Sequence, residues 1–290
     1  YNGSVFRFSD GKASLLVQFP SEYRIRNLAV DNEGHLYTGS YFGQLFRIAP
    51  NGTFTVFATG LWSINGMVFD GDGNLYVSAA ATYGIYRITP DGDKTLFMSI
   101  GNSTSKAFAR SLALDNEGNM YVVMTSTTSP PLFTYIVKVP LSNSTLRKTV
   151  LYMKGVRAYD IQSLCVRPDG KLLMTGVYNH NTDKEVGVYL IDPGSGNYEY
   201  YVEPKQGLML LCILSGPKGN MYVKSQWVEK GVPYYSISRI GESPSGGTGS
   251  VAPDTGISLT WEMILVVFSA LILVLMVVIL ARRSKNRKQK

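Results

Sequence analysis

A seven-residue pattern returns five times along this chain. The clear copies are Asp31-Asn-Glu-Gly-His-Leu-Tyr37, Asp70-Gly-Asp-Gly-Asn-Leu-Tyr76 and Asp115-Asn-Glu-Gly-Asn-Met-Tyr121, and the looser ones are Arg167-Pro-Asp-Gly-Lys-Leu-Leu173 and Gly216-Pro-Lys-Gly-Asn-Met-Tyr222. The last residues of successive copies lie 39, 45, 52 and 49 residues apart. A period of roughly 40–50 residues indicates an array of similar structural units.

One unit, residues 25–60, predicts four short strands at 27–30, 35–40, 44–48 and 53–57. Residues 31–34 and the pair Asn51-Gly52 are turn signals, with glycine supplying the positive φ. No segment before residue 257 keeps a 3.6-residue apolar period, which argues against helices in the repeat. A four-stranded antiparallel unit of this length, repeated around an axis, is a blade of a β-propeller. The sequence therefore predicts an all-β propeller.

The number of blades follows from the two ends of the array. Residues 4–8 and 13–19 resemble only the last two strands of a unit, and the last unit, from about residue 209 to 240, has three strands. We expect six blades with the first incomplete. The alternative is five blades, with the N-terminal strands completing the last one. The chain begins at Tyr1 without Met, which indicates a processed product or part of a longer chain whose missing start could hold the absent strands.

Charge argues against a nucleic-acid partner. The net charge of the 290 residues is +7, but six of the 28 basic residues lie in the last nine positions, leaving 22 basic against 21 acidic residues in the rest. A nearly neutral body lacks the basic footprint of nucleic-acid binding.

Cysteine and histidine offer little chemistry. Cys165 and Cys212 both fall in predicted innermost strands, where they serve as small buried hydrophobes or, if the domain is exported, form a disulfide. His35 and His180 lie far apart in the sequence and show no metal-ligand spacing. We expect both histidines to face solvent.

The C-terminal part predicts a membrane anchor after a propeller domain at residues 1–241. Residues 242–260 form a Gly/Ser/Pro-rich linker, and the predicted transmembrane helix, 261–281, contains a 19-residue run without charge. The basic tail at 282–290 marks the cytoplasmic side. We expect a single-pass protein of the cell surface, with the propeller outside and the C-terminus in the cytoplasm.

The end of the linker resembles a bacterial cell-wall sorting signal, in which a Leu-Pro-any-Thr-Gly motif precedes a hydrophobic run and a basic tail. The matching positions are Pro253, Thr255 and Gly256, with Asp254 at the variable position and Ala252 where Leu is usual. The resemblance implies a sortase as partner, cleavage after Thr255 and linkage to the cell wall. The alternative is a plain membrane anchor, and both place the propeller at the cell surface.

The sequence of the predicted propeller also resembles that of a known superfamily. Leu36-Tyr-Thr-Gly-Ser-Tyr-Phe-Gly-Gln-Leu-Phe-Arg-Ile48, Ile64-Asn-Gly-Met-Val-Phe-Asp70 and Gly73-Asn-Leu-Tyr-Val-Ser78 resemble six-bladed propellers of the gluconolactonase/strictosidine-synthase-like superfamily and NHL-type repeats. The resemblance covers about residues 3–240. It implies that lactonase-like members hold Ca²⁺ or another divalent cation in the central tunnel, through a Glu, Asn residues and an Asp near the starts of inner strands.

The repeat tests this implication by register. Counting 11 residues back from each anchor selects a ring of equivalent positions: Arg26, Asn65, Arg110, Gln162 and Leu211. Only Asn65 matches the metal-ligand pattern. The two arginines repel a cation because a guanidinium stays charged. The Asp expected after the second strand is also missing, and the positions in question hold Ser40, Ala79, Met124, Gly176 and Ser225. We therefore expect no metal and no catalytic residue. If a metal is present, Asn65 is its expected ligand. Asp160 and Glu22 lie nearby in the sequence and are acids that could rebuild a site.

Two readings remain for the donors of the ring, Arg26, Asn65, Arg110 and Gln162. They could bind an anion such as a carboxylate, a sulfate or an acidic sugar at the tunnel mouth. Alternatively, they pair with backbone carbonyls and plug the tunnel.

The surface offers further candidates for binding and modification. Aromatic residues near turns or strand ends could stack on sugars or anchor proteins, although blade packing explains most of them; they are Tyr83, Tyr178, Tyr198, Tyr200, Tyr201, Trp227, Tyr234 and Tyr235. Four Asn-x-Ser/Thr sequons, possible glycosylation sites, begin at Asn2, Asn51, Asn102 and Asn143.

The sequence therefore favours a surface-anchored propeller that binds a protein or glycan partner without catalysis. The alternative is a lactonase-like lactone or ester hydrolase with a modified central metal site. A passive spacer in an envelope assembly is a third interpretation that sequence does not separate from the first.

Overall fold

The computed structural model describes residues 3–9, 12–101, 104, 107–126, 133–154, 161–180, 183–202, 208–215, 221–229 and 232–240. The linker at 242–260 with its motif at 252–256, the predicted helix at 261–281 and the tail at 282–290 lie outside these residues. Among the residues that are described, no helix has the length and apolar character needed to cross a membrane.

The described strands form six antiparallel sheets, each built from consecutive strands. The first sheet pairs β1 (Ser4–Ser9) with β2 (Lys12–Gln18). The second contains β3 (Arg26–Val30), β4 (Leu36–Gly39), β5 (Leu45–Ile48) and β6 (Phe54–Ala58). The third contains β7 (Ile64–Phe69), β8 (Leu75–Ala79), β9 (Gly84–Ile88) and β10 (Lys94–Ser99).

The remaining three sheets follow the same plan with longer strands. The fourth contains β11 (Ala107–Leu114), β12 (Asn119–Ser126), β13 (Phe133–Pro140) and β14 (Lys148–Lys154). The fifth contains β15 (Ile161–Val166), β16 (Leu172–His180), β17 (Asp183–Ile191) and β18 (Tyr198–Val202). The sixth contains β19 (Leu208–Ser215), β20 (Met221–Glu229) and β21 (Val232–Ile240).

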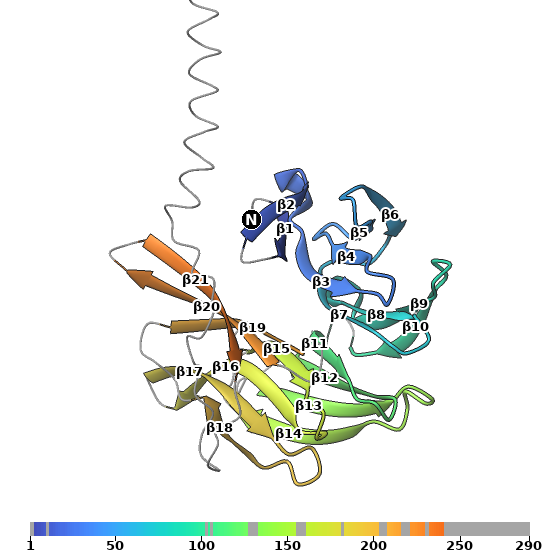
Figure 1. The fold of residues 1–290 in the computed structure, drawn as a ribbon. Coiled ribbons are helices and arrows are strands. Elements are labelled where there is room, and N and C mark those ends of the chain that lie inside the picture. The colour runs from blue at the N-terminus through green and yellow to red at the C-terminus, as the bar shows by residue number, and fades with distance from the viewer. Residues whose placement is uncertain are drawn as a thin grey trace, which may run out of the picture.

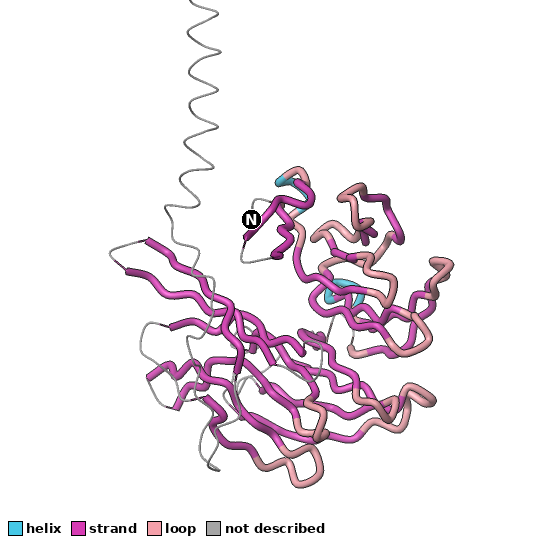
Figure 2. Tube along the Cα trace, viewed as in Figure 1, coloured by secondary structure: helices cyan, strands magenta, loops and turns pink. Residues whose placement is uncertain are grey.

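The sheets radiate from a common centre, as the blades of a propeller do (Figure 1). Successive inner strands contact one another in the order β3, β7, β11, β15 and β19. Strands dominate the trace (Figure 2), and the helices described are two single 3₁₀ turns, η1 (Ser21–Tyr23) and η2 (Ala80–Thr82). The predicted all-β propeller of four-stranded units is confirmed.

The two ends of the array match the predicted strand counts. The first sheet has two strands and the last has three. In the described pairings β1 joins β2, and β21 joins β20. The N-terminal strands therefore do not complete the last sheet, which is what five blades would require.

Antiparallel order gives the molecule two distinct faces. The connections between sheets and the turns between second and third strands lie at one end of the strands, which we call the connection face. The turns between first and second strands, and between third and fourth strands, lie at the other end. We call this the repeat face because it carries the seven-residue pattern.

The recurrent Asp stabilises the turn that begins each clear copy of the pattern. Asp31 Oδ1 accepts hydrogen bonds from the backbone N–H groups of Glu33 (3.0 Å) and His35 (2.9 Å). Equivalent pairs of bonds reach Asp70 and Asp115. Gly34 has a φ of +84°, in the left-handed region that glycine adopts without strain. In the second, third and fourth sheets the recurrence is therefore turn chemistry, repeated once per sheet.

Hydrophobic clusters fill the spaces between neighbouring sheets. One cluster joins the first two sheets through Val5, Val17, Phe19, Phe46 and Ile48. Three further clusters join the second sheet to the third, the third to the fourth and the fourth to the fifth. All five residues of β8 are buried because that strand is covered on both faces. Burial of this apolar surface is the main stabilising contribution.

Candidate functional site

Each inner strand has a β-bulge close to the ring predicted from the repeat. The pairing register shifts between Ile64 and Gly66 in β7, which leaves Asn65 without a cross-strand partner. The same shift isolates residues 110, 162 and 211 in β11, β15 and β19. Bulges re-aim a side chain out of the regular alternation of a strand. The 11-residue count therefore selects the bulge position in four of the five inner strands.

The first inner strand departs from that count by one residue. Arg26 is a paired residue of β3, opposite Gly39, and the bulge comprises Asn27 and Leu28. Asn27 has a φ of +57°, which asparagine tolerates better than other residues with a side chain. Asn27 therefore takes the place in the ring that the sequence predicts for Arg26.

The amides of the ring bond to the next inner strand. Asn27 Nδ2 donates to the carbonyl oxygens of Asn65 (2.6 Å) and Ile64 (3.3 Å). Asn65 Nδ2 donates to the carbonyl of Ala109 at 3.3 Å. Further round, Ser111 Oγ accepts from the Leu164 backbone N–H at 3.1 Å. These hydrogen bonds connect the inner strands of neighbouring blades.

The other predicted ring residues are placed less completely. Arg110 is half-buried at the bulge of β11. Gln162 holds the same position in β15, and its side chain, like that of Arg26, lies outside what the structure describes. Glu22 is exposed in η1 and therefore does not enter the ring, whereas Asp160 lies outside the described residues.

A central cavity of about 950 Å³ runs along the inner strands. Asn27, Asn65, Ser111 and Ser163 line it near the bulges. Towards the repeat face its lining becomes charged and includes both acidic and basic groups: Asp115, Glu117, Lys138, Arg167, Asp169, Lys171 and Asp192. A volume of this size accommodates a small molecule or a short chain segment.

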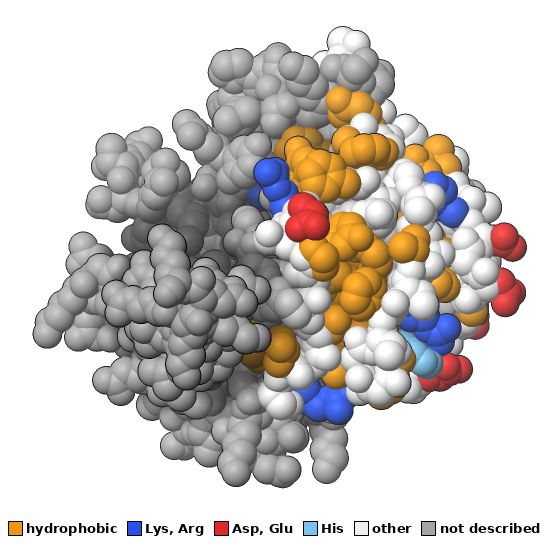
Figure 3. Space-filling view, turned by 90° about the horizontal axis from the view of Figure 1, so that it is seen from above, with side chains coloured by type: hydrophobic (Ala, Val, Ile, Leu, Met, Phe, Trp, Pro, Cys, Tyr) orange, Lys and Arg blue, Asp and Glu red, His pale blue; other side chains and the backbone are white. Residues whose placement is uncertain are grey.

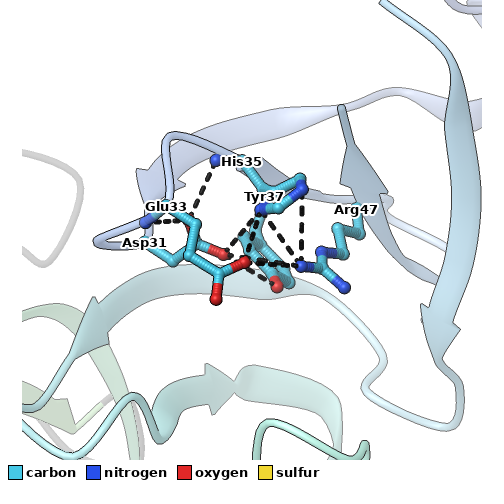
Figure 4. Close-up of polar contacts among 5 residues, drawn as sticks. All are labelled: Asp31, Glu33, His35, Tyr37 and Arg47. Atoms are coloured by element: carbon cyan, nitrogen blue, oxygen red, sulfur yellow. Dashed lines mark hydrogen bonds and ion pairs between the residues drawn. The ribbon is translucent and has the colours of Figure 1, made fainter. Parts of the chain in front are cut away.

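A compact group of polar side chains lies on the repeat face of the second sheet (Figure 4). Tyr37 donates from its hydroxyl to Asp31 Oδ2 at 3.3 Å, and burial raises the pKa of Tyr37 to about 12, so the phenol keeps its proton. Arg47, from β5, lies 3.6 Å from the Glu33 carboxylate and 3.0 Å from His35 Nδ1. Because a guanidinium can only donate, Nδ1 of the imidazole acts as the acceptor in that contact.

Asp31, Glu33 and His35 have ligand atoms close enough together to suggest a metal site. The Arg47 guanidinium already supplies the positive charge between them, as Figure 4 shows. Related groups recur in the third and fourth sheets, where Asn74 accepts from Arg87 (3.0 Å) and Lys138 approaches Asp115 (3.7 Å). A basic side chain therefore accompanies the recurrent turn in three successive sheets, which is what a network that stabilises the turn requires.

The charge of Asp115 is expected to matter for stability. Burial favours the neutral acid, but hydrogen bonds from the backbone and side chain of Asn119 and from the Glu117 N–H, with the Lys138 charge, outweigh it and lower the pKa of Asp115. A lowered pKa in the folded state adds stability above the unfolded value near 4, and this stability is lost as the pH falls through the folded value.

Asp115→Asn, which keeps the Oδ1 acceptor and removes the charge, should therefore lower the free energy of unfolding at pH 7 by about 1.5–3 kcal/mol. The difference from wild type should shrink as the pH falls below about 4, because the unfolded state binds the proton first, and it should be smallest below the folded-state pKa, where both states bind the proton. Urea unfolding at a series of pH values measures it, with exposed Asp91→Asn as the matched control. A difference that stays constant down to pH 2 would contradict the assignment.

Two of the four sequons lie on exposed turns of the repeat face. Asn51 Oδ1 accepts from Thr53 Oγ1 at 2.8 Å, and Asn143 Oδ1 accepts from Thr145 Oγ1 at 2.7 Å. Asn143 also lines a second cavity of about 590 Å³, beside Asp70, Asp72 and Arg87. Asn2 and Asn102 lie outside the described residues. Cys165 is buried in β15, and Cys212 occupies the neighbouring inner strand β19.

Comparison with known proteins places the fold among enzymes and binding proteins. No family model and no curated protein matches the chain. Virginiamycin B lyase from Staphylococcus aureus aligns with a TM-score of 0.54 at 11% identity, over 82% of this chain and 84% of that one. A gluconolactonase from Xanthomonas campestris gives 0.54 at 12% identity, over 73% and 82%. The calcium-binding protein regucalcin from Agrobacterium tumefaciens gives 0.53 at 13% identity, over 77% and 72%.

These similarities show the fold alone, because the identities are low. The chain shares the propeller fold of gluconolactonase-, lyase- and regucalcin-like proteins, of which the sequence resemblance named the gluconolactonase group. Fold similarity does not transfer chemistry, which depends on the site.

Some residues of the site were not anticipated from the sequence. Asn27 was missed because a bulge shifts its register by one residue, which the repeat does not reveal. Arg47, Arg87 and Lys138 could have been found from the sequence, because in the second, third and fourth sheets a basic residue lies just before the end of the third strand. Their role as partners of the recurrent Asp requires the sheet that brings them together.

Proposed function

We propose that this chain is a non-catalytic binding propeller displayed at the cell surface, with the central cavity as its primary ligand site. The observation that carries the proposal is that the Asn65 amide, the ring position that matches a lactonase-type metal ligand, donates to the Ala109 carbonyl. A side chain used in this way holds β7 to β11. The cavity beside it remains large enough for a ligand.

The charges around the cavity also favour binding over hydrolysis. Among the described residues that line it near the bulges, the polar groups are amides and hydroxyls. The acidic residues lie towards the repeat face, where Asp115 is engaged by backbone N–H groups. The rim, which carries both acidic and basic groups, suits a partner with its own polar groups, and we keep a protein or a glycan as the class of that partner.

Asn65→Asp separates binding from the alternative, a lactonase-like hydrolase with a modified Ca²⁺ site. If the amide is structural, the change removes the donor and places a carboxylate against a carbonyl. We expect it to lower the free energy of unfolding by about 1–3 kcal/mol. Ca²⁺ should then leave the melting temperature of both proteins unchanged, and neither should hydrolyse a lactone. Exposed Asn116→Asp is the matched control and should be nearly neutral.

Two results would overturn the proposal. One is Ca²⁺-dependent lactone hydrolysis by the wild-type chain. The other is a Ca²⁺-induced rise in melting temperature that Asn65→Asp preserves, since a carboxylate is a good ligand for this cation. For the ligand itself, a panel of oligosaccharides and peptides should be screened by ligand-observed NMR, with Ser163→Phe filling the cavity from β15. Hits that survive this filling would place binding elsewhere.

The cell-surface location of the protein is also part of the proposal. The hydrophobic run at 261–281 would anchor the protein, and a sortase would act at Thr255 if the motif at 252–256 is used. Mass spectrometry of the native C-terminus distinguishes a chain ending at Thr255 from a full-length membrane anchor.

A further inference from the structure

Exposed aromatic side chains gather on the connection face between the second and third sheets. Tyr41 and Phe42, in the turn between β4 and β5, are 39% and 45% exposed, and Trp62, just before β7, is 49% exposed. Arg24, which follows η1, lies beside Tyr41 and Phe42. We call Arg24, Tyr41, Phe42 and Trp62 the aromatic patch. The residues of the aromatic patch do not line either of the two cavities described above. Hydrophobic side chains reach the surface in several places, and Figure 3 shows one face of the molecule where they do.

The backbone beneath the patch is fixed by hydrogen bonds between neighbouring connections. Tyr41 N–H donates to the Tyr23 carbonyl (3.2 Å), and Ser63 N–H donates to the Tyr41 carbonyl (3.1 Å). Ala81 N–H, in η2, donates to the Trp62 carbonyl (3.2 Å). The aromatic residues are therefore held on a rigid frame. A binding surface that is ordered beforehand loses less entropy when a ligand arrives.

Gly43 brings two of these connections into contact. Its N–H and carbonyl lie in the β4–β5 turn, where the carbonyl accepts from the Leu61 N–H at 3.1 Å. Its φ is +90°, and a Cβ there would come within 3.2 Å of the Leu61 and Trp62 backbone nitrogens and 3.3 Å of Trp62 Cγ. The position of the Trp62 ring therefore depends on the absence of a side chain at residue 43.

Arg24 adds one positive charge to the aromatic surface. Its guanidinium carbon lies 5.9 Å from the ring centroids of both Tyr41 and Phe42. Within the described part of the chain, the interactions of this guanidinium are these two ring contacts. In that part of the chain, Arg24 forms no ion pair with Glu22. Its φ of +47° belongs to the left-handed cap that ends η1, where the Arg24 N–H donates to the Ser21 carbonyl at 3.1 Å, and Tyr83 has the same conformation after η2.

We propose that the aromatic patch binds an acidic carbohydrate. A pyranose ring presents an apolar C–H face that stacks on an exposed indole or phenol, and its carboxylate or sulfate would accept paired hydrogen bonds from Arg24. An apolar peptide anchor would instead require a pocket to bury it. The Tyr41 and Phe42 rings meet edge to face, with 5.5 Å between centroids and 89° between planes, and both remain exposed. Their exposed surfaces and the guanidinium beside them suit a sugar with a negative charge. This site is distinct from the central cavity and does not depend on its having a ligand.

Titration of the full chain with trigalacturonic acid tests the proposal, with neutral maltotriose as the comparison sugar. Binding is followed by calorimetry and by the change in tryptophan fluorescence. We expect saturable binding of the acidic sugar at micromolar to low millimolar concentration and at least about tenfold weaker binding of the neutral one. Trp62→Ala should weaken acidic-sugar binding at least about tenfold and remove most of the fluorescence change.

Two further variants separate charge from stacking. Arg24→Gln should make the acidic and neutral sugars bind equally weakly. Gly43→Ala should weaken binding while every side chain of the patch is retained. Tyr152→Ala, another exposed aromatic residue, is the matched control and should bind like wild type. The basic tail at 282–290 is common to all these proteins, so its contribution cancels, and melting curves verify that each variant is folded.

Several outcomes would overturn the proposal. These are absence of saturable binding at about 10 mM trigalacturonic acid, equal affinity for the two sugars, or wild-type affinity in folded Trp62→Ala and Arg24→Gln. Binding that Tyr152→Ala abolishes while the patch variants retain it would move the site. Binding that is lost with Ser163→Phe and unaffected by the patch variants would assign the sugar to the central cavity instead.

Discussion

Replacing Phe19 with alanine is expected to lower the free energy of unfolding by about 3–5 kcal/mol, because the substitution removes a large side chain from a fully buried position. Phe19 is 0% exposed. Its ring lies 4.3 Å from that of Phe54 and 5.1 Å from that of Phe46, measured between centroids. The cluster around it joins the two-stranded first sheet to the second. Phe19→Ala should therefore loosen the N-terminal hairpin as well as destabilise the whole domain.

Phe6→Ala is the matched control for this prediction. Phe6 lies in β1 of the same hairpin but is 49% exposed, so the same truncation should cost less than about 1 kcal/mol. Equilibrium unfolding in urea measures both variants. Hydrogen exchange of β1 and β2 shows whether the hairpin separates before the rest of the domain unfolds. Equal losses in the two variants would mean that Phe19 does not dock the hairpin as described.

A methyl group added at Gly39 should be the second large perturbation. A Cβ at this buried position would lie 2.6 Å from Ile64 Cδ1, 2.7 Å from Cβ and 2.8 Å from Cγ2 of the same residue. Ile64 is 1% exposed in β7, so it has little room to move. Gly39→Ala is expected to lower the free energy of unfolding by about 1–3 kcal/mol through this overlap between the second and third sheets.

Gly71→Ala is the control, because a Cβ there meets nothing within 4 Å. It should be neutral or slightly stabilising, by up to about 1 kcal/mol, since alanine reduces the freedom of the unfolded chain. A double-mutant cycle with Ile64→Ala tests the cause directly. The double variant should be more stable than the sum of the two single losses implies, by at least about 0.5 kcal/mol. Additive losses would show that the Cδ1 and Cγ2 atoms of Ile64, which alanine removes, are not what Gly39 avoids.

The sequence predicted the blade plan because each blade needs the same local chemistry. The Asp at the start of a clear copy accepts its own turn N–H groups, and the Gly three residues on adopts a positive φ. Both requirements are met within a few residues, so they leave a pattern that can be read along the chain. The two-stranded first sheet and the three-stranded last sheet followed from the same pattern.

The candidate sites were only partly predictable. The register count found the bulge at Asn65 but selected Arg26 where the structure places Asn27, because a bulge changes the count between strand and turn. The aromatic patch was not anticipated, since Arg24, Tyr41 and Trp62 belong to three connections that are far apart in the pattern. The aromatic residues singled out from the sequence include Tyr198, which is 42% exposed but packs at 6.2 Å against the Tyr189 ring.

The sequence by itself determined the repeated four-stranded unit and its turns, because these depend on contacts between residues close in the chain, and it left the choice between five and six blades open. The tertiary structure alone decided which atoms occupy the centre. Asn65 donates to a carbonyl 44 residues away, and Arg47 meets the acids of a turn on another strand. The first contact depends on how neighbouring blades pack, and the second depends on how the strands of one blade pair. The repeat spacing does not show which atoms these arrangements bring together.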